Sequence, residues 1–432
     1  MNMKTKQYLM SIYGSIIVLL LILLQFSCKK ELTIGNPDNV SVAHISKLDI
    51  VWNKYFYSDS SLTSFNTPQF TNDYIIVCTY LNHGQELGAK VFNKTTGEPH
   101  QSWLHDPIHT THQDALYNGV VCGPNNDVFT MTDRTKLIAM DINSGQVKWT
   151  HNYLPVNCLS VCSKLGDDII QTFGTWNNSD RWSSIGRFNY ENGNMLTLLT
   201  IHANDEYDFN INAPSVYVSF SQDTILYFST SCVNYYTLDE RIDAYAYNMS
   251  KGTMLWKVAD ISENVFAMSK YPPLIAEKKV IFHTGTSMHC FDLETGELVW
   301  ERTYAQGTES FNQNPFVYYQ GKIFVQSGAK VPIRAFEMST GKLIWESHEA
   351  IEIIGGGFDI YKGNLYFTAS YVIDNGANMA YGLCCVNTAG GKLMWKDRGV
   401  GAGIAIDHNT GYLYGTGANN VLCIDLNNTP KN

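Results

Sequence analysis

Three stretches of this 432-residue chain decide its fold: LIAMDINSGQVKW (137–149), MHCFDLETGELVW (288–300) and IRAFEMSTGKLIW (333–345). Each begins with an apolar strand, places a polar residue four positions before a glycine, and ends in a second strand that contains tryptophan. An Asx side chain can cap turn amides, and glycine adopts the positive φ that closes a tight hairpin. The pattern therefore predicts an antiparallel hairpin at each copy.

The same offset between a polar residue and a glycine recurs seven times. The pairs are Asn93 and Gly97, Asp141 and Gly145, Asn189 and Gly193, Asn248 and Gly252, Asp292 and Gly296, Glu337 and Gly341, and Asn387 and Gly391. The six intervals from Gly97 to Gly391 average 49 residues, which suits four short antiparallel strands with their turns. A tryptophan follows most of these glycines by four residues, at Trp149, Trp256, Trp300, Trp345 and Trp395. The first and third copies have Gln101 and Thr197 there.

Another strand precedes each turn, and there are eight such strands. They are expected at Ile75–Tyr80, Val128–Asp133, Ile169–Thr175, Leu226–Ser231, Val280–Thr286, Ile323–Ala329, Leu365–Tyr371 and Leu413–Asn419. The eighth copy continues into Val421–Leu426 and has no glycine or tryptophan after it, whereas Leu48–Tyr55 carries Trp52 in the aromatic position. We predict an all-β fold over residues 46–432, an eight-bladed β-propeller of four-stranded antiparallel blades in which the N-terminal strand completes the last blade.

The N-terminus has the pattern of a secretion signal. Lys4 and Lys6 precede an apolar run at Ile16–Leu24, and Ser27 stands directly before Cys28. The pattern resembles a bacterial lipoprotein signal, with residues 1–27 as the signal peptide and Cys28 as the lipidated new N-terminus. We expect residues 28–45 to form a flexible tether that holds the protein at the outer membrane, on its periplasmic side or at the cell surface. An uncleaved signal anchor is the alternative.

The three quoted stretches resemble PQQ-like β-propeller repeats, and the resemblance extends over residues 46–426. Within this superfamily, a lipid-anchored ring of eight blades is similar to the BamB family of outer-membrane assembly lipoproteins. The resemblance implies a non-catalytic scaffold that binds envelope or outer-membrane proteins, and a monomeric ring. It also implies that the outer-strand tryptophans dock against the next blade, namely Trp52, Trp149, Trp256, Trp300, Trp345 and Trp395.

An enzyme is the alternative that the same resemblance raises. PQQ-dependent dehydrogenases hold the quinone and a calcium ion on the ring axis, under a disulfide between adjacent cysteines. Cys384 and Cys385 are adjacent, but they lie inside the strand YGLCCVN, where successive side chains face opposite ways. The sequence has no EF-hand-like loop and no C-x-x-C-H haem site. We expect no enzymatic activity and no cofactor. The alternatives are a PQQ-dependent dehydrogenase-like module with calcium, a periplasmic ligand-binding module, or a glycan-binding surface lipoprotein.

Four histidines fall close together in the link between the first two blades. They are His100, His105, His109 and His112. Imidazoles at this spacing can bind zinc or copper, but neither a cysteine nor a repeated carboxylate spacing completes a known metal pattern. We treat His105, His109 and His112 as weak metal candidates and expect surface or inter-blade histidines.

The loops between the second and third strands are expected to project from the face opposite the glycine turns. They are longest at TWNNSDRWSS (175–184), SCVNYYTLDER (231–241) and SYVIDNGANMAYG (370–382). These loops carry Trp176, Arg181, Trp182, Tyr235, Tyr236, Arg241, Tyr371 and Tyr381. Aromatic residues and arginine anchor protein interfaces, so we predict that this face binds partner proteins. The net charge of −10 disfavours nucleic acid as a partner.

Overall fold

The structure is a computed structural model, and it describes most of the compact unit Ala43–Asn432. The described residues are 48–55, 62–63, 67–81, 86–100, 120–123, 127–133, 136–152, 157–158, 163–166, 168–177, 180–204, 207–234, 236–237, 240–261, 272–284, 287–303, 316–325, 332–348, 353–373, 378–398, 403–416 and 420–429. The predicted signal peptide (1–27), Cys28 and the predicted tether (28–45) lie outside these residues and stay predictions.

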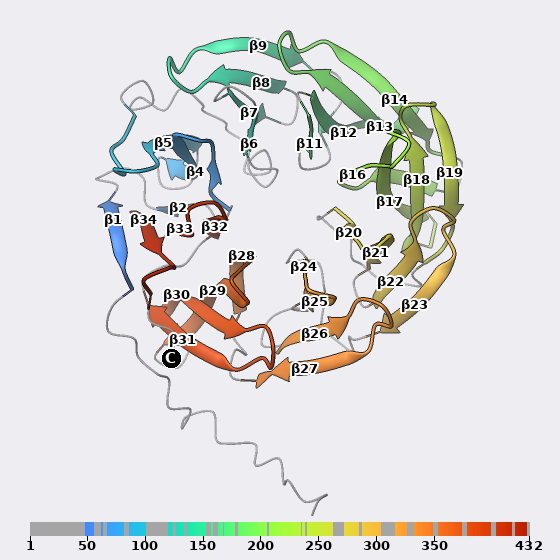
Figure 1. Cartoon of the computed structure of the whole chain (residues 1–432). Helices are drawn as coiled ribbons and strands as arrows, with labels where there is room; N and C mark the ends of the chain where they lie inside the picture. Colours follow the sequence, from blue (N-terminus) through green and yellow to red (C-terminus); the bar gives the residue numbers. More distant parts are fainter. Residues whose placement is uncertain are drawn as a thin grey trace, which may run out of the picture. The chain divides into compact units, whose positions relative to one another are not determined.

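The described strands form eight antiparallel sheets, arranged in a ring (Figure 1). We number these sheets as blades 1 to 8 in chain order. Contacts between innermost strands link blade 1 with blade 2, blade 3 with blade 4, and each successive pair from blade 4 to blade 8. The described part of the chain contains no α-helix, and accordingly none there that has the length and hydropathy of a membrane span. The predicted all-β, eight-bladed propeller is confirmed.

Blades 1 to 4 take up the first half of the ring. Blade 1 contains β2 (Leu62–Thr63), β3 (Gln69–Phe70), β4 (Tyr74–Leu81) and β5 (Glu86–Asn93). Blade 2 contains β6 (Val120–Cys122), β7 (Asp127–Asp133), β8 (Lys136–Asp141) and β9 (Val147–Asn152). Blade 3 contains β10 (Asn157–Cys158), β11 (Ser163–Leu165), β12 (Asp168–Asn177), β13 (Asp180–Asn189) and β14 (Met195–His202). Blade 4 contains β15 (Tyr207–Ile211), β16 (Ser215–Val218), β17 (Thr224–Asn234), β18 (Glu240–Asn248) and β19 (Thr253–Val258).

Blades 5 to 8 complete the ring. Blade 5 contains β20 (Leu274–Ala276), β21 (Lys279–His283), β22 (Ser287–Asp292) and β23 (Leu298–Thr303). Blade 6 contains β24 (Val317–Tyr319), β25 (Lys322–Val325), β26 (Ile333–Glu337) and β27 (Leu343–Ser347). Blade 7 contains β28 (Ile353–Tyr361), β29 (Asn364–Ile373), β30 (Asn378–Asn387) and β31 (Leu393–Arg398). Blade 8 contains β32 (Gly403–Asp407), β33 (Tyr412–Thr416), β34 (Asn420–Asp425) and, from the other end of the chain, β1 (Ile50–Tyr55).

Two blade positions depart from the regular plan. In blades 1, 3 and 4 the innermost strand is divided into two pieces, and both pieces pair with the same second strand. In blade 1 the described part of the outermost position is a single bridge between Phe92 and Pro99. Blades 2, 5, 6 and 7 follow the order innermost to outermost along the chain, and blade 8 does so except for its outermost strand β1.

The repeated glycines close the hairpins between the third and fourth strands. All seven have φ between 66° and 73°, which is the left-handed region that glycine enters without a steric penalty. In six of these turns the glycine N–H donates to the carbonyl of the polar residue four positions earlier, at 2.8–3.1 Å. At Gly97, for example, the Asn93 side chain also accepts the N–H groups of Thr95 and Thr96, each at 2.9 Å.

Five of the outer-strand tryptophans cover the turn glycine of the next blade. Their indole N–H groups donate to carbonyls there, from Trp52 to Lys94, Trp149 to Tyr190, Trp256 to Leu293, Trp300 to Met338 and Trp345 to Thr388. A Cβ atom on the covered glycine would lie only 2.5–2.7 Å from the indole. Glycine is therefore required at these turns by the close approach of the tryptophan as well as by φ.

The last blade ends this series without a glycine. The Thr429 N–H donates to the Asp425 carbonyl at 3.1 Å, which is the bond that glycine makes in the other turns. Trp395, which is 3% exposed, lines a cavity of about 260 Å³ together with Thr429. The blade 7 tryptophan therefore meets a threonine-closed turn.

The contact between blades 3 and 4 is made in another way, because Thr197 stands where most blades have tryptophan. Tyr247 of β18 donates its hydroxyl to the Leu198 carbonyl of β14 at 2.8 Å. A Cβ atom on Gly252 would meet only the Tyr247 hydroxyl, at 3.8 Å. One tyrosine hydrogen bond replaces the tryptophan at this junction.

Replacing Tyr247 by phenylalanine tests that junction. The substitution keeps the ring but leaves the Leu198 carbonyl without its donor, so the free energy of unfolding should fall by about 1 kcal/mol. Urea unfolding measures this change. The control is Tyr236→Phe, at a side chain that is 79% exposed, and equal midpoints for both variants would contradict the assignment.

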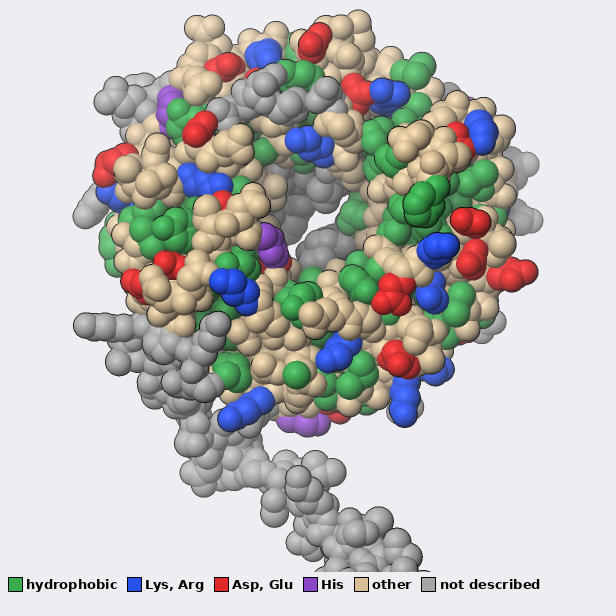
Figure 2. All heavy atoms as spheres, viewed as in Figure 1, with side chains coloured by type: hydrophobic (Ala, Val, Ile, Leu, Met, Phe, Trp, Pro, Cys, Tyr) green, Lys and Arg blue, Asp and Glu red, His purple; other side chains and the backbone are tan. Residues whose placement is uncertain are grey.

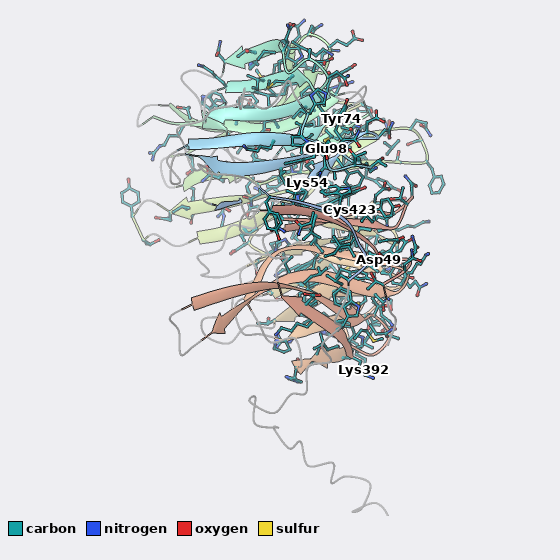
Figure 3. The ribbon with its side chains drawn as sticks, turned by 90° about the vertical axis from the view of Figure 1, so that its left-hand side faces the viewer. Asp49, Lys54, Tyr74, Glu98, Lys392 and Cys423 are labelled. Atoms are coloured by element: carbon teal, nitrogen blue, oxygen red, sulfur yellow. The ribbon has the colours of Figure 1, made fainter. Side chains whose placement is uncertain are left out.

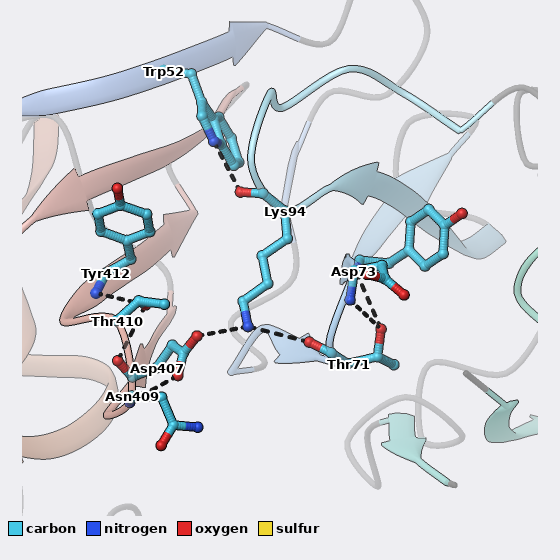
Figure 4. Close-up of polar contacts among 9 residues, drawn as sticks. Trp52, Thr71, Asp73, Lys94, Asp407, Asn409, Thr410 and Tyr412 are labelled. Carbon is cyan, nitrogen blue, oxygen red and sulfur yellow. Dashed lines mark hydrogen bonds and ion pairs between the residues drawn. The ribbon is translucent and has the colours of Figure 1, made fainter. Parts of the chain in front are cut away.

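The two chain ends meet in blade 8, as the sequence predicts. β1 pairs antiparallel with β34, and Trp52 lies opposite Cys423 (Figure 1). Beside this pairing, Lys94 of blade 1 reaches Asp407 of blade 8, and its Nζ lies 2.6 Å from Oδ2 of that carboxylate (Figure 4). The same Nζ donates to the Thr71 carbonyl at 3.3 Å and lies 4.7 Å from the centre of the Phe70 ring. We refer to this cluster as the closure lock.

Candidate functional site

The ring has two faces that differ in their connections. The turns between third and fourth strands lie on one face, which carries Glu98 and Lys392 at the right of Figure 3. Because neighbouring strands run antiparallel, the hairpins between second and third strands lie on the opposite face. We name these the turn face and the hairpin face. Figure 2 shows an opening at the centre of the ring and acidic and basic side chains interspersed over the viewed face.

The three elaborations on the hairpin face are mostly paired strand. β12 and β13 stay paired as far as Asn177 and Asp180, β17 and β18 pair as far as Val233 and Glu240, and β29 and β30 pair throughout their length. The prediction of long loops is wrong here, because pairing satisfies backbone N–H and C=O groups that a loop would leave to water. The hairpins extend the blades instead.

Two of the predicted interface residues are engaged within the fold. Trp182 is half-buried and packs edge-on against Phe173 with ring centres 5.8 Å apart. The Arg241 guanidinium lies 4.5 Å from the centre of the Tyr207 ring, and its Nε is 3.5 Å from Oδ1 of Asp243. The Asp243 side chain is fully buried, so Arg241 serves a buried ion pair. Sequence reasoning missed this role because the partner carboxylate carries no motif.

The structure describes the side chains of only some of the other predicted interface residues. Tyr236 is 79% exposed on the hairpin face, and Arg181 is half-buried. The backbones of Trp176, Tyr371 and Tyr381 lie in paired strands, but their side chains, and all of Tyr235, lie outside the described residues.

The predicted histidine cluster is only partly described. His100 packs edge-on against Tyr74, with ring centres 4.9 Å apart, whereas His105, His109 and His112 lie outside the described residues. Within the described ranges no three His, Cys, Asp or Glu side chains come close enough together to hold a metal ion.

The outermost strands carry a surface that sequence reasoning missed. Two consecutive apolar residues precede the docking tryptophan in β1, β19, β23 and β27, and each is 40–54% exposed: Ile50 and Val51, Met254 and Leu255, Leu298 and Val299, Leu343 and Ile344. A register shift beside each pair lets both residues face solvent while the tryptophan turns inward. The sequence signal for this surface is the pair of apolar residues before each tryptophan, in IVW, MLW, LVW and LIW. We name these four strands the rim strands.

Each rim strand also has one free backbone edge. Among the described strands, β1, β19, β23 and β27 are terminal in their sheets, and each hydrogen-bonds to one neighbouring strand. Exposed strand edges can pair with another chain, and apolar side chains beside them favour that pairing. The rim therefore combines unpaired backbone groups with apolar side chains.

Near the ring axis, an acidic residue lines a cavity between innermost strands. Asp359 of β28 lines a cavity of about 240 Å³ with Gly357 and Phe70. Burial raises the pKa of Asp359, and the neighbouring His408 opposes this shift. Its Oδ1 lies 3.1 Å from His408 Nε2 and accepts the Ile360 N–H at 2.7 Å, while Oδ2 accepts the Ile406 N–H at 3.3 Å.

These described residues do not fit a quinone with calcium. Calcium takes six to eight oxygen ligands, whereas both Asp359 oxygens already accept hydrogen bonds from the protein. Cys384 packs between blades 6 and 7 with Phe324, and Cys385 packs between blades 7 and 8 with Leu422. Both thiols are buried on opposite faces of one sheet, away from a position above the axis.

Comparison with known proteins finds a family resemblance in part of the chain. Residues 223–370 match the family model described as outer membrane protein assembly factor BamB. The chain is a β-propeller, and this part of it is similar to that family. The crystal structure of BamB from Moraxella catarrhalis is 15% identical, with a TM-score of 0.51, over 88% of this chain and 100% of that chain.

Other similar proteins differ in what they do. A europium-containing methanol dehydrogenase is 12% identical, with a TM-score of 0.60, over 89% of this propeller and 86% of that chain. Tetrathionate hydrolase of Acidithiobacillus ferrooxidans is 26% identical over 149 residues, which is 30% of either chain. The propeller therefore spans 30% of the length of this curated relative. At these identities, the solved structures show a shared fold.

Proposed function

We propose that this propeller is a non-catalytic envelope scaffold that binds partner proteins through its rim strands, in the manner of an outer-membrane assembly factor. The observation that carries the proposal is the rim, where four apolar pairs lie on strands with a free backbone edge. The partner offers an extended segment that adds a strand to one blade, with its apolar side chains on the exposed pair. The match of residues 223–370 to the assembly-factor family supports this role.

The proposal extends to location and cofactors. Lipidation at Cys28 would hold the ring at the outer membrane, close to the proteins it binds. The scaffold needs neither PQQ nor calcium, and the engaged Asp359 carboxylate supports this. Tyr236 supplies a further exposed aromatic contact on the hairpin face.

Serine substitution of each apolar pair, one rim strand at a time, tests the proposal. Each half-exposed side chain that becomes buried on binding contributes about 1 kcal/mol, so replacing both residues of the pair that contacts the partner should lower the affinity about thirtyfold. Mild cross-linking of the lipid-anchored protein in cell envelopes, followed by co-purification, measures retention of the partner. One of the four variants, such as Leu298→Ser with Val299→Ser, is expected to lose it.

The control is Val218→Ser, which changes a side chain that is 51% exposed on the innermost strand β16. It should retain the partner and the wild-type melting temperature. Full retention in all four rim variants would contradict docking on the rim. Reduction of a dye with alcohols or sugars after addition of PQQ and calcium would overturn the non-catalytic role.

A further inference from the structure

A cleft of about 460 Å³ lies between the outer parts of blades 4 and 5. Its polar lining comes from Asp260, just after β19, and from Ser287, His289, Glu301 and Thr303 of β22 and β23. Ile261 contributes to an apolar wall. The volume is in the range of sites that bind small molecules, and none of these residues belongs to the axis or to the closure lock.

The blade 5 side of the cleft follows from strand geometry. His289 of β22 pairs with Glu301 of β23, and Ser287 pairs with Thr303. Side chains two apart on a strand share a face, and so do directly paired residues. All four groups therefore point into the same space between the blades.

His289 has an unsatisfied ring nitrogen in this cleft. The residue is 5% exposed, and its Nε2 lies 3.0 Å from the Ser287 hydroxyl. Its Nδ1 lies 3.9 Å from Oε1 of Glu301, beyond hydrogen-bonding distance, and has no other partner in the described part of the chain. Burial lowers the pKa of His289, although Glu301 opposes the shift, so the ring is neutral at neutral pH. In the tautomer that donates Nε2–H to Ser287, Nδ1 is a free acceptor.

The blade 4 side of the cleft is held by a buried ion network. Asp260 has φ of 57°, a left-handed conformation that aspartate tolerates better than most residues. Its N–H donates to Oδ1 of Asp243 at 2.9 Å. The fully buried Asp243 carboxylate is in turn held by Lys257 at 3.0 Å and by Arg241 at 3.5 Å.

This network leaves the Asp260 carboxylate available. Within the described residues its oxygens form no hydrogen bond or ion pair, while its backbone is fixed by Asp243. Lys257 lies over the Tyr245 ring, and Tyr245 packs in the layer between blades 3 and 4. The cations that neutralise Asp243 are thus on the opposite side of blade 4 from the cleft.

We propose that the cleft binds a guanidinium or alkylammonium group on an aliphatic stem. The carboxylates of Asp260 and Glu301 accept charge-assisted hydrogen bonds from the cation, and His289 Nδ1 accepts another. The stem lies along the apolar wall at Ile261, as arginine and lysine stems do on other apolar surfaces. Such a group occurs in free amines such as agmatine and in arginine or lysine side chains of a protein. The proposal stands independently of the scaffold role.

Calorimetry on the full-length protein tests this with agmatine, with arginine, and with citrulline, which has the shape of arginine without its charge. Arginine is expected to bind at least tenfold more tightly than citrulline. Asp260→Asn and Glu301→Gln should each weaken agmatine binding about tenfold, because each removes one charge-assisted contact. Asparagine also tolerates the left-handed conformation at position 260.

The matched control is Glu297→Gln, an exposed carboxylate that precedes β23 and does not line the cleft. Equal affinities for arginine and citrulline, both as free compounds and within the same extended peptide, or equal losses in Glu297→Gln and Glu301→Gln, would overturn the proposal. Ester hydrolysis that is lost in Ser287→Ala would also overturn it, since Ser287, His289 and Glu301 would then serve as a nucleophile with its base.

Two further binding measurements distinguish the possible sources of the cation. Binding of agmatine alone identifies a small-molecule site, whereas binding only of an extended peptide that contains arginine identifies a partner side chain. Leu298 lines the cleft and also belongs to rim strand β23, so a peptide could occupy both. Retention of the envelope partner by Asp260→Asn would separate this site from the scaffold role.

Discussion

Replacing Lys94 by methionine is expected to lower the free energy of unfolding by about 3–5 kcal/mol and to weaken the join between blades 8 and 1. The substitution keeps an apolar stem beside Phe70 but removes the only cation within 4 Å of Asp407 among the described residues. The Asp407 side chain is 4% exposed, so the carboxylate stays buried and uncompensated. Urea unfolding measures the loss, and hydrogen exchange at β1 and β34 locates it.

The matched control is Lys54→Met at the same seam. Lys54 pairs with Glu98 (Figure 3). Their side chains are 31% and 66% exposed. An exposed pair contributes at most about 1 kcal/mol, so this variant should unfold almost like the wild type. Adding Asp407→Asn to Lys94→Met should recover part of the stability, because the buried charge is then gone. Equal losses at Lys94 and Lys54 would contradict the importance of the closure lock.

The closure lock also predicts how stability depends on pH. Burial alone would raise the pKa of Asp407, but hydrogen bonds from Lys94 and Asn409 outweigh it and hold the pKa below the ordinary value of 3.8. A carboxyl whose folded-state pKa is depressed stabilises the fold above its unfolded pKa. This contribution is complete above about pH 4 and is lost as pH falls through the folded-state pKa. Acid titration of Lys94→Met should lack this component.

The second large effect is expected at Gly341. Alanine there must adopt φ of 66°, which costs about 1–2 kcal/mol. Its Cβ would also lie 2.6 Å from the Trp300 ring, and overpacking of this kind costs about 1–3 kcal/mol. Gly341→Ala should therefore lower the free energy of unfolding by about 3–4 kcal/mol, as measured by urea unfolding.

Gly252→Ala separates the two causes. Gly252 has the same φ of 66°, but a Cβ there would meet only the Tyr247 hydroxyl at 3.8 Å. This variant should lose only the backbone contribution of about 1–2 kcal/mol. Equal losses of unfolding free energy at Gly252 and Gly341 would show that the docked tryptophan does not require glycine at the turn.

Part of the candidate surface could be predicted from the sequence, and part could not. The hairpin face was expected from strand order, and Tyr236 is exposed there. Trp182 and Arg241 are also residue types that anchor protein interfaces, but in this fold they pack against Phe173 and Tyr207. A residue type cannot tell whether a neighbour from the same blade will cover it. The rim pairs were missed because apolar letters before a tryptophan look like core until the register shift is seen.

The sequence by itself determined the eight blades, the turn glycines and the N-terminal strand that completes blade 8. These features can be predicted because each depends on a local turn pattern that recurs along the chain and on the number of strands available. Only the tertiary structure decided that Lys94 contacts Asp407 and that Asp260 and His289 line the same cleft. Such pairs come from different blades, and their meeting depends on how the blades pack, which no local pattern encodes.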